Sequence, residues 1–421
     1  MKYFIQTYGC QMNKSDSERI AGMLENLGCK KASSECEADL VVLNTCVVRQ
    51  SAEDRVYGKL KNLEKLKKPN PKLKVAVTGC MASLYPEKIK DKADLIFSIE
   101  ELPKLSHLLK SIKYPNPESD YLHIQPSYDS NFHAYVPIMT GCNNFCSYCV
   151  VPYARGKERS RPAEEIIKEV TDLVNRGYKA ITLVGQNVNS YGHDLGKEIN
   201  FAQLLKKANN ISGDFWIWFI TSHPKDMSDE LINTIAECEK VCPYVHLPVQ
   251  SGNNAILKAM NRGYTQEHYI DLVEKIRKKI PNVALSTDII VGFPGETKKQ
   301  FQDTAGLFKK IKFDMAYIAQ YSPRSKTQAY KLKDNVSLCE KKKREKILTD
   351  ILKRTALEHN KKLVEKIVEV LVEKSKDNFE IGKTKGSKTV KFQSNKNLLG
   401  QIVKIKITQA MAWGLEGKYV K

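Results

Sequence analysis

The chain has 421 residues, too many for one ordinary domain, and its 42% hydrophobic content is enough to bury several cores. No stretch approaches the ~20 consecutive apolar residues of a membrane span, and the first residues lack the apolar core of a signal peptide, so we expect a cytoplasmic protein with no membrane contact. Lys and Arg outnumber Asp and Glu by 68 to 48, and this net charge of +20 favours a polyanionic partner, nucleic acid first.

Residues 1–112 alternate short β-rich runs with helix-like segments, the pattern of a parallel sheet covered by helices. Three of the predicted strands end in a cysteine, namely Cys10, Cys46 and Cys80. Ligands of open α/β sheets bind beyond the carboxyl ends of the strands, so we expect these thiols to converge on one site. Three separately buried cysteines are the alternative. In a reducing cytosol, grouped cysteines indicate metal or cluster ligation rather than disulfides.

Residues 113–130 are rich in Pro, Ser, Asn and Asp and are predicted to form a linker. Residues 131–357 repeat a strand-and-helix pattern about six times and end in a basic helix. This pattern predicts a full or partial parallel barrel whose site lies in the loops after the strands. The first of these loops carries Cys142, Cys146 and Cys149, so these thiols should lie at the mouth of the barrel.

The three cysteines of this loop form a C-x3-C-x2-C array within eight residues, and no fourth cysteine or nearby histidine completes it. Structural zinc sites and iron–sulfur clusters usually take four protein ligands. The array therefore leaves one coordination position for another molecule. Two interpretations stay open at this point: a cluster with one open iron, or a zinc ion whose shell is completed by His or water.

Residues 358–421 change to a period of two, with five short strands separated by Asn, Gly and Ser turns, which predicts a small barrel of the OB type. Residues 331–421 contain 23 Lys and Arg against 11 Asp and Glu, and residues 381–410 contain seven lysines and no acid. Lysines that alternate with apolar residues would line one outer face and suit a phosphate backbone. A stabilising appendage with solvated lysines is the alternative.

The segment "CNNFCSYC" resembles the signature of the radical S-adenosylmethionine superfamily. Together with "YGCQMNKSDSE", "GCNNFCSYCVVPYARGKERSRP", "TSHPKD", "LPVQSG" and "STDIIVGFPGET", it makes the whole chain similar to the radical methylthiotransferases, and most similar to their tRNA-modifying, MiaB-type branch. This resemblance implies an N-terminal methylthiotransferase domain over 1–112, a radical core over 131–357 and a C-terminal TRAM domain over 358–421.

The resemblance also implies the chemistry. Such enzymes bind two 4Fe-4S clusters, each through three thiols, and consume two molecules of S-adenosylmethionine per turnover. One molecule chelates the open iron of the array's cluster and yields the 5′-deoxyadenosyl radical; the other methylates sulfur held at the second cluster. The product is the 2-methylthio derivative of N(6)-isopentenyl-adenosine, on the 3′ side of the tRNA anticodon. The implied cluster ligands here are Cys142, Cys146 and Cys149 for the first cluster and Cys10, Cys46 and Cys80 for the second. The implied partners are the anticodon stem-loop of tRNA and an electron donor, and we expect a monomer.

Further polar and glycine residues follow predicted strands, where a barrel places ligand contacts, and could hold the methionine and adenosine parts of S-adenosylmethionine. They are Gln186, Asn187, Ser222, Gln250, Ser251 and Gly292. Ordinary loop turns and caps are the alternative for each. Arg155 and Arg159 could meet phosphate or the substrate base, or pair with local acids. Five ungrouped cysteines are expected to be structural: Cys29, Cys36, Cys238, Cys242 and Cys339.

Two rival functions remain at this stage. The first is a methylthiotransferase that acts on the threonylcarbamoyl-adenosine of other tRNAs or on an aspartate of a ribosomal protein. The second belongs to another class, a non-catalytic protein that binds zinc and RNA. Glycine-bearing loops after the predicted barrel strands favour a small-molecule site over the second rival.

Overall fold

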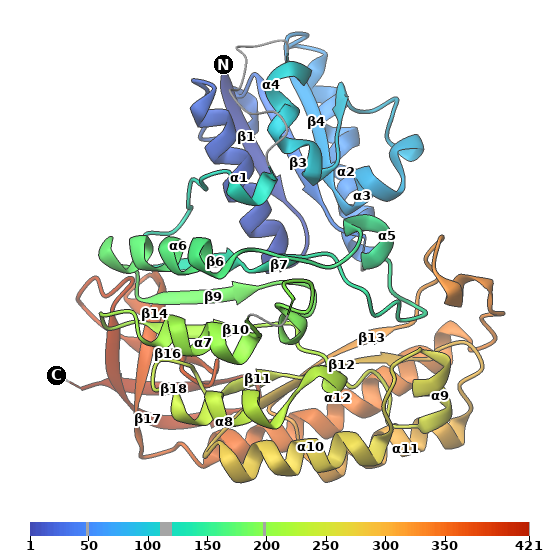
Figure 1. Ribbon diagram of the computed structural model, residues 1–421, viewed down its shortest axis with the longest axis vertical. Coiled ribbons are helices and arrows are strands. Elements are labelled where there is room, and N and C mark those ends of the chain that lie inside the picture. The colour runs from blue at the N-terminus through green and yellow to red at the C-terminus, as the bar shows by residue number, and fades with distance from the viewer. Residues whose placement is uncertain (48–49, 110–119, 197–198, 421) are drawn as a thin grey trace. The chain divides into compact units, whose positions relative to one another are not determined.

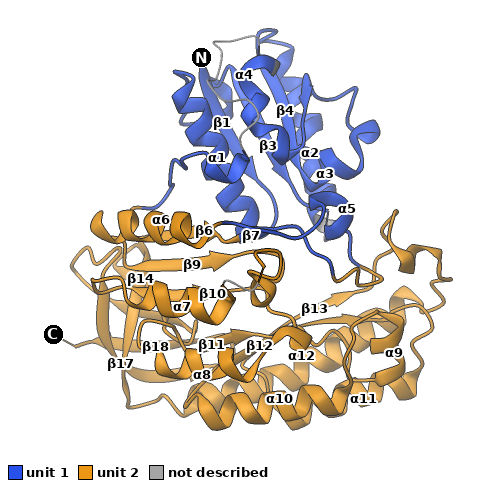
Figure 2. Ribbon diagram, in the orientation of Figure 1, with its two compact units in different colours: residues 1–130, 139–143, 149–161 blue, residues 131–138, 144–148, 162–421 orange. Residues whose placement is uncertain are grey.

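The computed structural model describes residues 1–47, 50–109, 120–196 and 199–420 (Figure 1). The chain forms two compact units (Figure 2). Unit 1 comprises residues 1–130, 139–143 and 149–161, and unit 2 comprises residues 131–138, 144–148 and 162–421. Within the described residues, no helix has both the length and the apolar composition to cross a membrane.

Unit 1 contains a five-stranded parallel sheet in the order β2-β1-β3-β4-β5. Its strands are β1 (Lys2–Thr7), β2 (Lys30–Lys31), β3 (Leu40–Thr45), β4 (Lys74–Gly79) and β5 (Leu95–Ile96). Its helices are α1 (Gln11–Asn26), α2 (Gln50–Lys67), α3 (Cys80–Leu84), α4 (Leu105–Leu108) and α5 (Val151–Arg155). The central strand β3, sequence LVVLNT, is buried at every position, as expected for a parallel strand with both faces covered.

Two features of unit 1 were not apparent in the sequence. The short strand β2 extends the sheet beyond β1. The pair β7 (Met139–Thr140) and β8 (Arg159–Ser160), together with α5, comes from the segment around the cysteine array. Residues 113–119 of the predicted linker lie outside the described residues, whereas Tyr121 and Leu122 are buried in unit 1.

Unit 2 contains the predicted partial barrel of six parallel strands, in the order β6-β9-β10 and β11-β12-β13. A single parallel bridge between Ile217 and Val241 connects the two groups of three. The strands are β6 (His133–Pro137), β9 (Ala180–Val184), β10 (Trp216–Phe219), β11 (Tyr244–His246), β12 (Ala284–Val291) and β13 (Met315–Gln320). The helices are α6 (Ala163–Asn175), α7 (Phe201–Asn209), α8 (Asp229–Glu237), α9 (Asn254–Ala259), α10 (Gln266–Lys279), α11 (Lys298–Ile311) and α12 (Leu338–Lys361).

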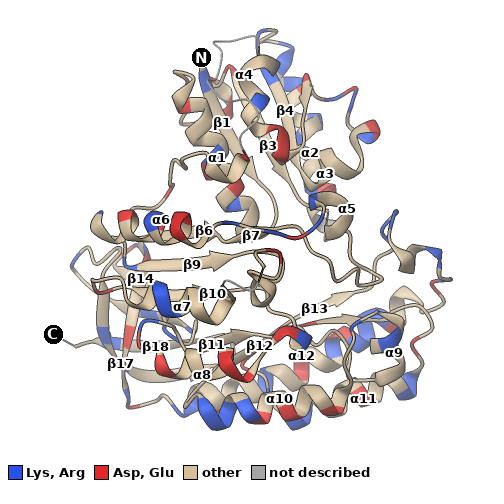
Figure 3. Ribbon diagram, viewed as in Figure 1, with Lys and Arg blue, Asp and Glu red and all other residues tan. Residues whose placement is uncertain are grey.

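The C-terminal residues of unit 2 form a closed five-stranded barrel, which we call the C-terminal barrel, in the order β14-β15-β16-β18-β17. All five strands lie where the sequence predicts them: β14 (Ile367–Lys376), β15 (Phe379–Thr384), β16 (Thr389–Gln393), β17 (Ile402–Met411) and β18 (Gly414–Tyr419). On β17, Val403, Ile405 and Ile407 are buried, whereas Lys404 and Lys406 are exposed. The period-two pattern therefore places these lysines on the outer face of β17. Figure 3 marks the Lys and Arg positions along the ribbon.

The C-terminal barrel covers the amino ends of the parallel strands in unit 2. Leu371 of β14 belongs to one apolar cluster with Ala180 and Trp216, the first residues of β9 and β10. The Trp218 indole donates to the Lys385 carbonyl over 3.0 Å, and Lys388 pairs with Asp314 over 2.6 Å. The loops at the opposite, carboxyl ends of the strands therefore remain free of the C-terminal barrel.

Candidate active site

Three cysteines of unit 1 follow three neighbouring strands of its sheet. Cys46 comes directly after β3, Cys80 begins α3 directly after β4, and Cys10 caps α1, three residues after β1. A Cβ atom placed on Gly9 would lie 2.7 Å from Cys46 Cβ, and Cys10 is near enough to Cys80 to contribute to a raised pKa of the Cys80 thiol, whose main cause is burial. The structure thus brings the three residues together at the carboxyl edge of the sheet. We call them the N-terminal trio.

A buried amide network fixes the loops that carry the N-terminal trio. Asn13 Oδ1 accepts from Cys10 Sγ over 3.3 Å, while Asn13 Nδ2 donates to Asn44 Oδ1 over 3.0 Å and to the Thr45 carbonyl over 3.1 Å. Asn13 and Asn44 are each about 1% exposed or less. Because buried amides hold one geometry when their bonds are satisfied, this network orients Cys10 relative to the end of β3.

The backbone of the cysteine array is held in a bent shape. Gly141 has φ +76°, and a Cβ atom there would lie 2.0 Å from the Lys157 carbonyl oxygen, so only glycine fits. The Cys142 amide donates to the Gly156 carbonyl over 3.2 Å, and Phe145 has φ +45°. Cys142 and Cys149 are assigned to unit 1 and Cys146 to unit 2.

Arg262 of unit 2 contacts the array, which the sequence did not reveal. Its Nη1 lies 3.3 Å from Cys146 Sγ, and its Nη2 donates to the Pro248 carbonyl over 2.6 Å. Burial alone would lower the pKa of the guanidinium, but Tyr148, Tyr264 and Cys146 reverse this effect and raise it, so the cation persists. No local signal marks this arginine, because its partner cysteine is 116 residues away in the chain.

The mouth of the parallel barrel gathers buried oxygen atoms that have no hydrogen-bond partner among the described residues. Four belong to predicted cofactor contacts: Gln186 Oε1, Asn187 Oδ1, Ser222 Oγ and Gln250 Oε1. A fifth is Asn189 Oδ1, which the sequence did not single out. Each such atom costs about 1–3 kcal/mol when left unpaired. Their concentration after β9, β10 and β11 fits a polar ligand such as S-adenosylmethionine.

Backbone strain occurs at the same place. Gln250 has φ +69° and Thr221, directly before Ser222, has φ +73°. Residues other than glycine rarely adopt this region, and a β-branched residue there costs of the order of 1–3 kcal/mol. Strain of this kind is tolerated where the surrounding structure must aim a side chain, which agrees with a ligand site at these loops.

His223 adds a neutral donor to the mouth. Its Nδ1 accepts from the Lys225 amide over 3.3 Å, so the ring proton resides on Nε2, which has no partner within the described part of the chain. Burial, followed by the charges of Arg262 and Lys225, lowers the pKa of His223 to about 2. The imidazole therefore stays uncharged at neutral pH and can donate one hydrogen bond to a ligand.

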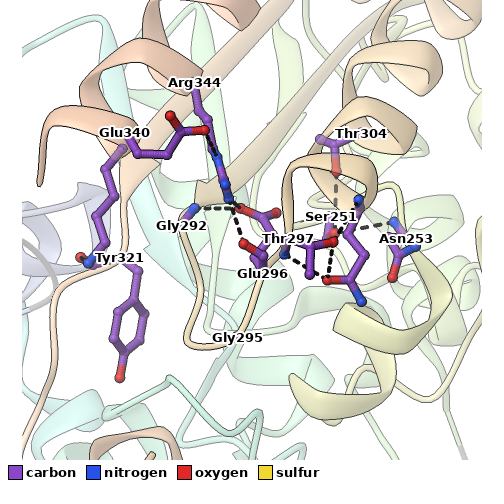
Figure 4. Close-up of polar contacts among 12 residues, drawn as sticks. Ser251, Asn253, Gly292, Gly295, Glu296, Thr297, Thr304, Tyr321, Glu340 and Arg344 are labelled. Atoms are coloured by element: carbon purple, nitrogen blue, oxygen red, sulfur yellow. Dashed lines mark hydrogen bonds and ion pairs between the residues drawn. The ribbon is translucent and has the colours of Figure 1, made fainter. Parts of the chain in front are cut away.

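Ser251 and Gly292 differ from the other predicted contacts because the fold already uses them (Figure 4). Ser251 Oγ lies 3.4 Å from Thr304 Oγ1 and accepts from the Asn253 amide over 3.2 Å. The Gly292 amide donates to Glu296 Oε2 over 2.7 Å, and Arg344 holds the same carboxylate over 2.7 Å. These contacts support the turn-and-cap interpretation for these two residues.

Two serine substitutions should therefore change stability in opposite directions. Ser222→Ala removes an unpaired buried hydroxyl, so we expect unfolding of the ligand-free protein to cost about 1 kcal/mol more, while the affinity for S-adenosylmethionine falls. Ser251→Ala removes a hydroxyl that is bonded and should destabilise the protein by about 1 kcal/mol. Denaturant titration and isothermal calorimetry measure both quantities. A destabilised Ser222→Ala protein with unchanged cofactor affinity would contradict a ligand role for Ser222.

The remaining predicted residues divide clearly. Arg155 pairs with Asp16 and Arg159 with Asp120, so both arginines meet acids, although these acids are 139 and 39 residues away in the chain. Among the ungrouped cysteines, Cys29, Cys238 and Cys242 are buried, as expected of structural residues, whereas Cys36 and Cys339 are exposed. Within the described residues, no three His, Cys, Asp or Glu side chains are close enough to hold a single metal ion; a four-iron cluster instead attaches each thiolate to a different iron.

Three family models match the chain. They are the Radical SAM superfamily over residues 136–308, an uncharacterized protein family, UPF0004, over residues 2–99, and the TRAM domain over residues 361–420. Each match falls inside one of the predicted domains, whose boundaries themselves stay predictions. The presence of a Radical SAM domain implies a 4Fe-4S cluster and S-adenosylmethionine.

Curated relatives match over the full chain. Three proteins named tRNA-2-methylthio-N(6)-dimethylallyladenosine synthase are 45% identical in Thermoanaerobacter pseudethanolicus, 47% in Syntrophomonas wolfei and 47% in Clostridium novyi. These alignments cover 99–100% of this chain and 93–97% of the relatives. The chain belongs to the tRNA-2-methylthio-N(6)-dimethylallyladenosine synthase family. Membership of this synthase family confirms the resemblance drawn from the sequence motifs.

Solved structures support the fold expected for the synthase family. The radical S-adenosylmethionine methyltransferase TsrM from Kitasatospora setae matches with a TM-score of 0.56 at 13% identity, over 78% of this chain and 77% of that chain. The cobalamin-dependent radical enzyme OxsB matches with a TM-score of 0.55 at 13% identity, over 85% of this chain and 56% of that chain. At such low identity, these likenesses concern the fold alone.

Proposed function

We propose that this protein converts N(6)-isopentenyl-adenosine (dimethylallyladenosine), on the 3′ side of the tRNA anticodon, into its 2-methylthio derivative. The observation that carries this proposal is the full-length identity of about 45% to synthases of that name. The presence of two separate three-cysteine groups supports it, because the reaction joins a radical step to a sulfur-transfer step. The rival zinc-binding function offers no reason for two incomplete ligand sets.

Cys142, Cys146 and Cys149 would hold a 4Fe-4S cluster with one iron left open for S-adenosylmethionine. When bound, these groups supply the one-electron chemistry that activates a C–H bond no side-chain base can usefully deprotonate. The chain's own contribution is placement. The buried oxygens of Gln186, Ser222 and Gln250 would accept hydrogen bonds from the bound ligand, and His223 Nε2 would donate one, so that the ligand is oriented.

We assign Cys10, Cys46 and Cys80 to a second 4Fe-4S cluster that holds the sulfur to be transferred. Adjacent strands β1, β3 and β4 bring the three residues to one edge of the sheet. Two molecules of S-adenosylmethionine would be used in each turnover, one as methyl donor and one as radical source. We further propose a cytoplasmic monomer that receives electrons from a separate reductant.

The tRNA would reach the protein through the C-terminal barrel. Lys406 on β17 is paired directly with Lys418 on β18, and Lys404 projects from the same face of β17. Lys406 is ion-paired with Glu365 over 2.8 Å, whereas Lys404 and Lys418 are exposed on the same surface, so an RNA phosphate that neutralises these two lysines is favoured. An unpaired loop nucleotide costs less to extend into a pocket than a paired one, which suits the anticodon loop as the site of reaction.

Removing two of these lysines should weaken RNA binding in a salt-dependent way. We expect Lys404→Ala with Lys418→Ala to lower the affinity for tRNA and to reduce the slope of log affinity against log salt by about 0.7–0.9 for each phosphate that is no longer neutralised. The matched control is Lys278→Ala with Lys279→Ala on α10, which removes the same charge from two other exposed positions. Filter binding over a range of salt provides the measurement. Equal slopes for both double variants would mean that the C-terminal barrel is a structural appendage.

The assay that tests the proposed function uses anaerobically reconstituted protein, dithionite and S-adenosylmethionine. Anticodon stem-loop RNA carrying N(6)-isopentenyl-adenosine should yield the 2-methylthio nucleoside, detected by mass spectrometry after digestion. The same RNA carrying threonylcarbamoyl-adenosine should yield none. Product from the second substrate only would establish the rival methylthiotransferase activity, and stoichiometric zinc without sulfide would favour the non-catalytic protein.

A further inference from the structure

A buried ion pair lies beside the N-terminal trio. Arg155 Nη2 is 2.6 Å from Asp16 Oδ2, and the two side chains are 4% and 1% exposed. Asp16 belongs to α1, the helix that Cys10 caps, and Arg155 is the last residue of α5, which packs against α3 and its first residue Cys80. All of these residues belong to unit 1.

The guanidinium of Arg155 acts on Cys80. Arg155 is close enough to the Cys80 sulfur to act on it as a weak hydrogen-bond donor and through its charge, whereas Asp16 acts on the same sulfur with the opposite sign. Burial alone would lower the pKa of Arg155, but Asp16, Cys80 and Tyr121 outweigh it and keep the cation. Arg155 Nη1 nevertheless makes no well-formed hydrogen bond to any described residue.

Packing does not account for this arrangement. A buried ion pair gains little or nothing over two apolar side chains of similar volume, because both charges lose their hydration. Here one nitrogen of the cation and one oxygen of Asp16 also remain unpaired within the described chain. A cation kept at this cost, next to a thiol, indicates that the site must stabilise negative charge.

We propose that Arg155 is the positioning residue of the N-terminal trio, held by Asp16 so that its guanidinium fixes Cys80 and offsets the negative charge of a thiolate-bound cluster. This inference rests on the proposed second cluster of the preceding section. Three thiolates make the loaded site anionic, and each added electron increases that charge. The potentials of iron–sulfur clusters follow net charge and hydrogen bonding to sulfur, so Arg155 should make the site easier to reduce.

The test uses a background in which Cys142, Cys146 and Cys149 are replaced by alanine, so that only the N-terminal trio can bind a cluster. The double variant Arg155→Gln with Asp16→Asn removes both charges together and leaves no buried ion unpaired. Arg155→Lys keeps the positive charge but replaces the planar guanidinium, which can contact Asp16 and Cys80 at the same time, with a single ammonium group. Arg159→Gln is the matched control, because it removes another cation of the same segment, whose partner is Asp120 and whose side chain is 45% exposed.

The measurements are iron and sulfide content, thermal unfolding, and the midpoint potential of the cluster followed by electron paramagnetic resonance. We expect the charge-free double variant to fold and to lose its iron faster to a chelator. Its midpoint potential should be more negative, because Arg155 acts on Cys80 more strongly than Asp16 does, although the variant leaves the net charge unchanged. Arg155→Lys should lie between the double variant and the background, and Arg159→Gln should match the background. An unchanged potential and unchanged iron retention in the double variant would overturn the proposed role of Arg155 but would leave the proposed second cluster intact. A background protein that binds no cluster would overturn both this role and the proposed second cluster.

Discussion

Replacing Cys46 with alanine is expected to abolish methylthio transfer while 5′-deoxyadenosine formation continues. Cys46 follows the central strand β3 and is 5% exposed, so its loss as a packing group would cost only about 1 kcal/mol and leave the protein folded. Loss of a cluster ligand has a different consequence, because it removes the cluster's attachment and not only a packing contact. Activity should fall by more than the ~10–100-fold that is typical when only an outer-shell partner of a metal site is removed.

Cys29→Ala provides the matched control for this experiment. Cys29 is similarly buried, at 8% exposed, and belongs to the same unit, but it is not part of the N-terminal trio. The Cys29→Ala protein should retain methylthio transfer, 5′-deoxyadenosine formation and both clusters. Nucleoside mass spectrometry measures the methylthio product, and chromatography measures 5′-deoxyadenosine in the same reaction. Normal methylthio product from a folded Cys46→Ala protein would remove the second cluster from the mechanism.

The second large effect concerns the array. A triple change of Cys142, Cys146 and Cys149 to alanine should eliminate 5′-deoxyadenosine altogether, because no cluster could then hold S-adenosylmethionine for reductive cleavage. Iron content should fall by about four atoms per chain, the content of one 4Fe-4S cluster. Methylation at the other cluster should survive, since it needs neither a radical nor the array.

The pair Cys238 and Cys242 supplies the control for the triple variant. These residues have a C-x3-C spacing like the first half of the array, yet both are buried and neither lies in the loop of the array. Alanine at both positions should therefore leave iron content and 5′-deoxyadenosine yield unchanged. A triple variant that forms 5′-deoxyadenosine at the normal rate would contradict the radical assignment of the array.

Local periodicity explains why most of the fold could be predicted. The alternation in 402–411 and the turn residues around it are sufficient to place β17, because the two faces of a strand differ at each step. The N-terminal trio could be anticipated for the same reason, since each cysteine follows a recognisable strand. The two-residue strand β2 has no pattern of its own and was not predicted.

Interactions between distant residues account for what the sequence could not show. Arg155 and Asp16 are 139 residues apart, and Arg262 and Cys146 are 116 residues apart, so no local pattern joins them. A position directly after a strand also does not distinguish a residue that contacts a ligand from one that supports the loop. Ser222 and Ser251 occupy similar places in the chain, but only the hydrogen bonds of the folded protein show that Ser251 supports a loop while Ser222 has an unpaired hydroxyl.

The discontinuous make-up of unit 1 limits how the protein can be divided or recombined. A fragment of residues 1–130 would lack 139–143 and 149–161, which complete the unit. Asp16 would then lose Arg155 and leave a buried unpaired carboxylate, at a cost of about 3–5 kcal/mol. A chimera between two members of this family should therefore take residues 139–143 and 149–161 from the same parent as residues 1–130. By the same reasoning, a cut in the linker would separate residues 1–130 from the two segments that complete unit 1, whereas every residue of unit 2 would stay in one fragment.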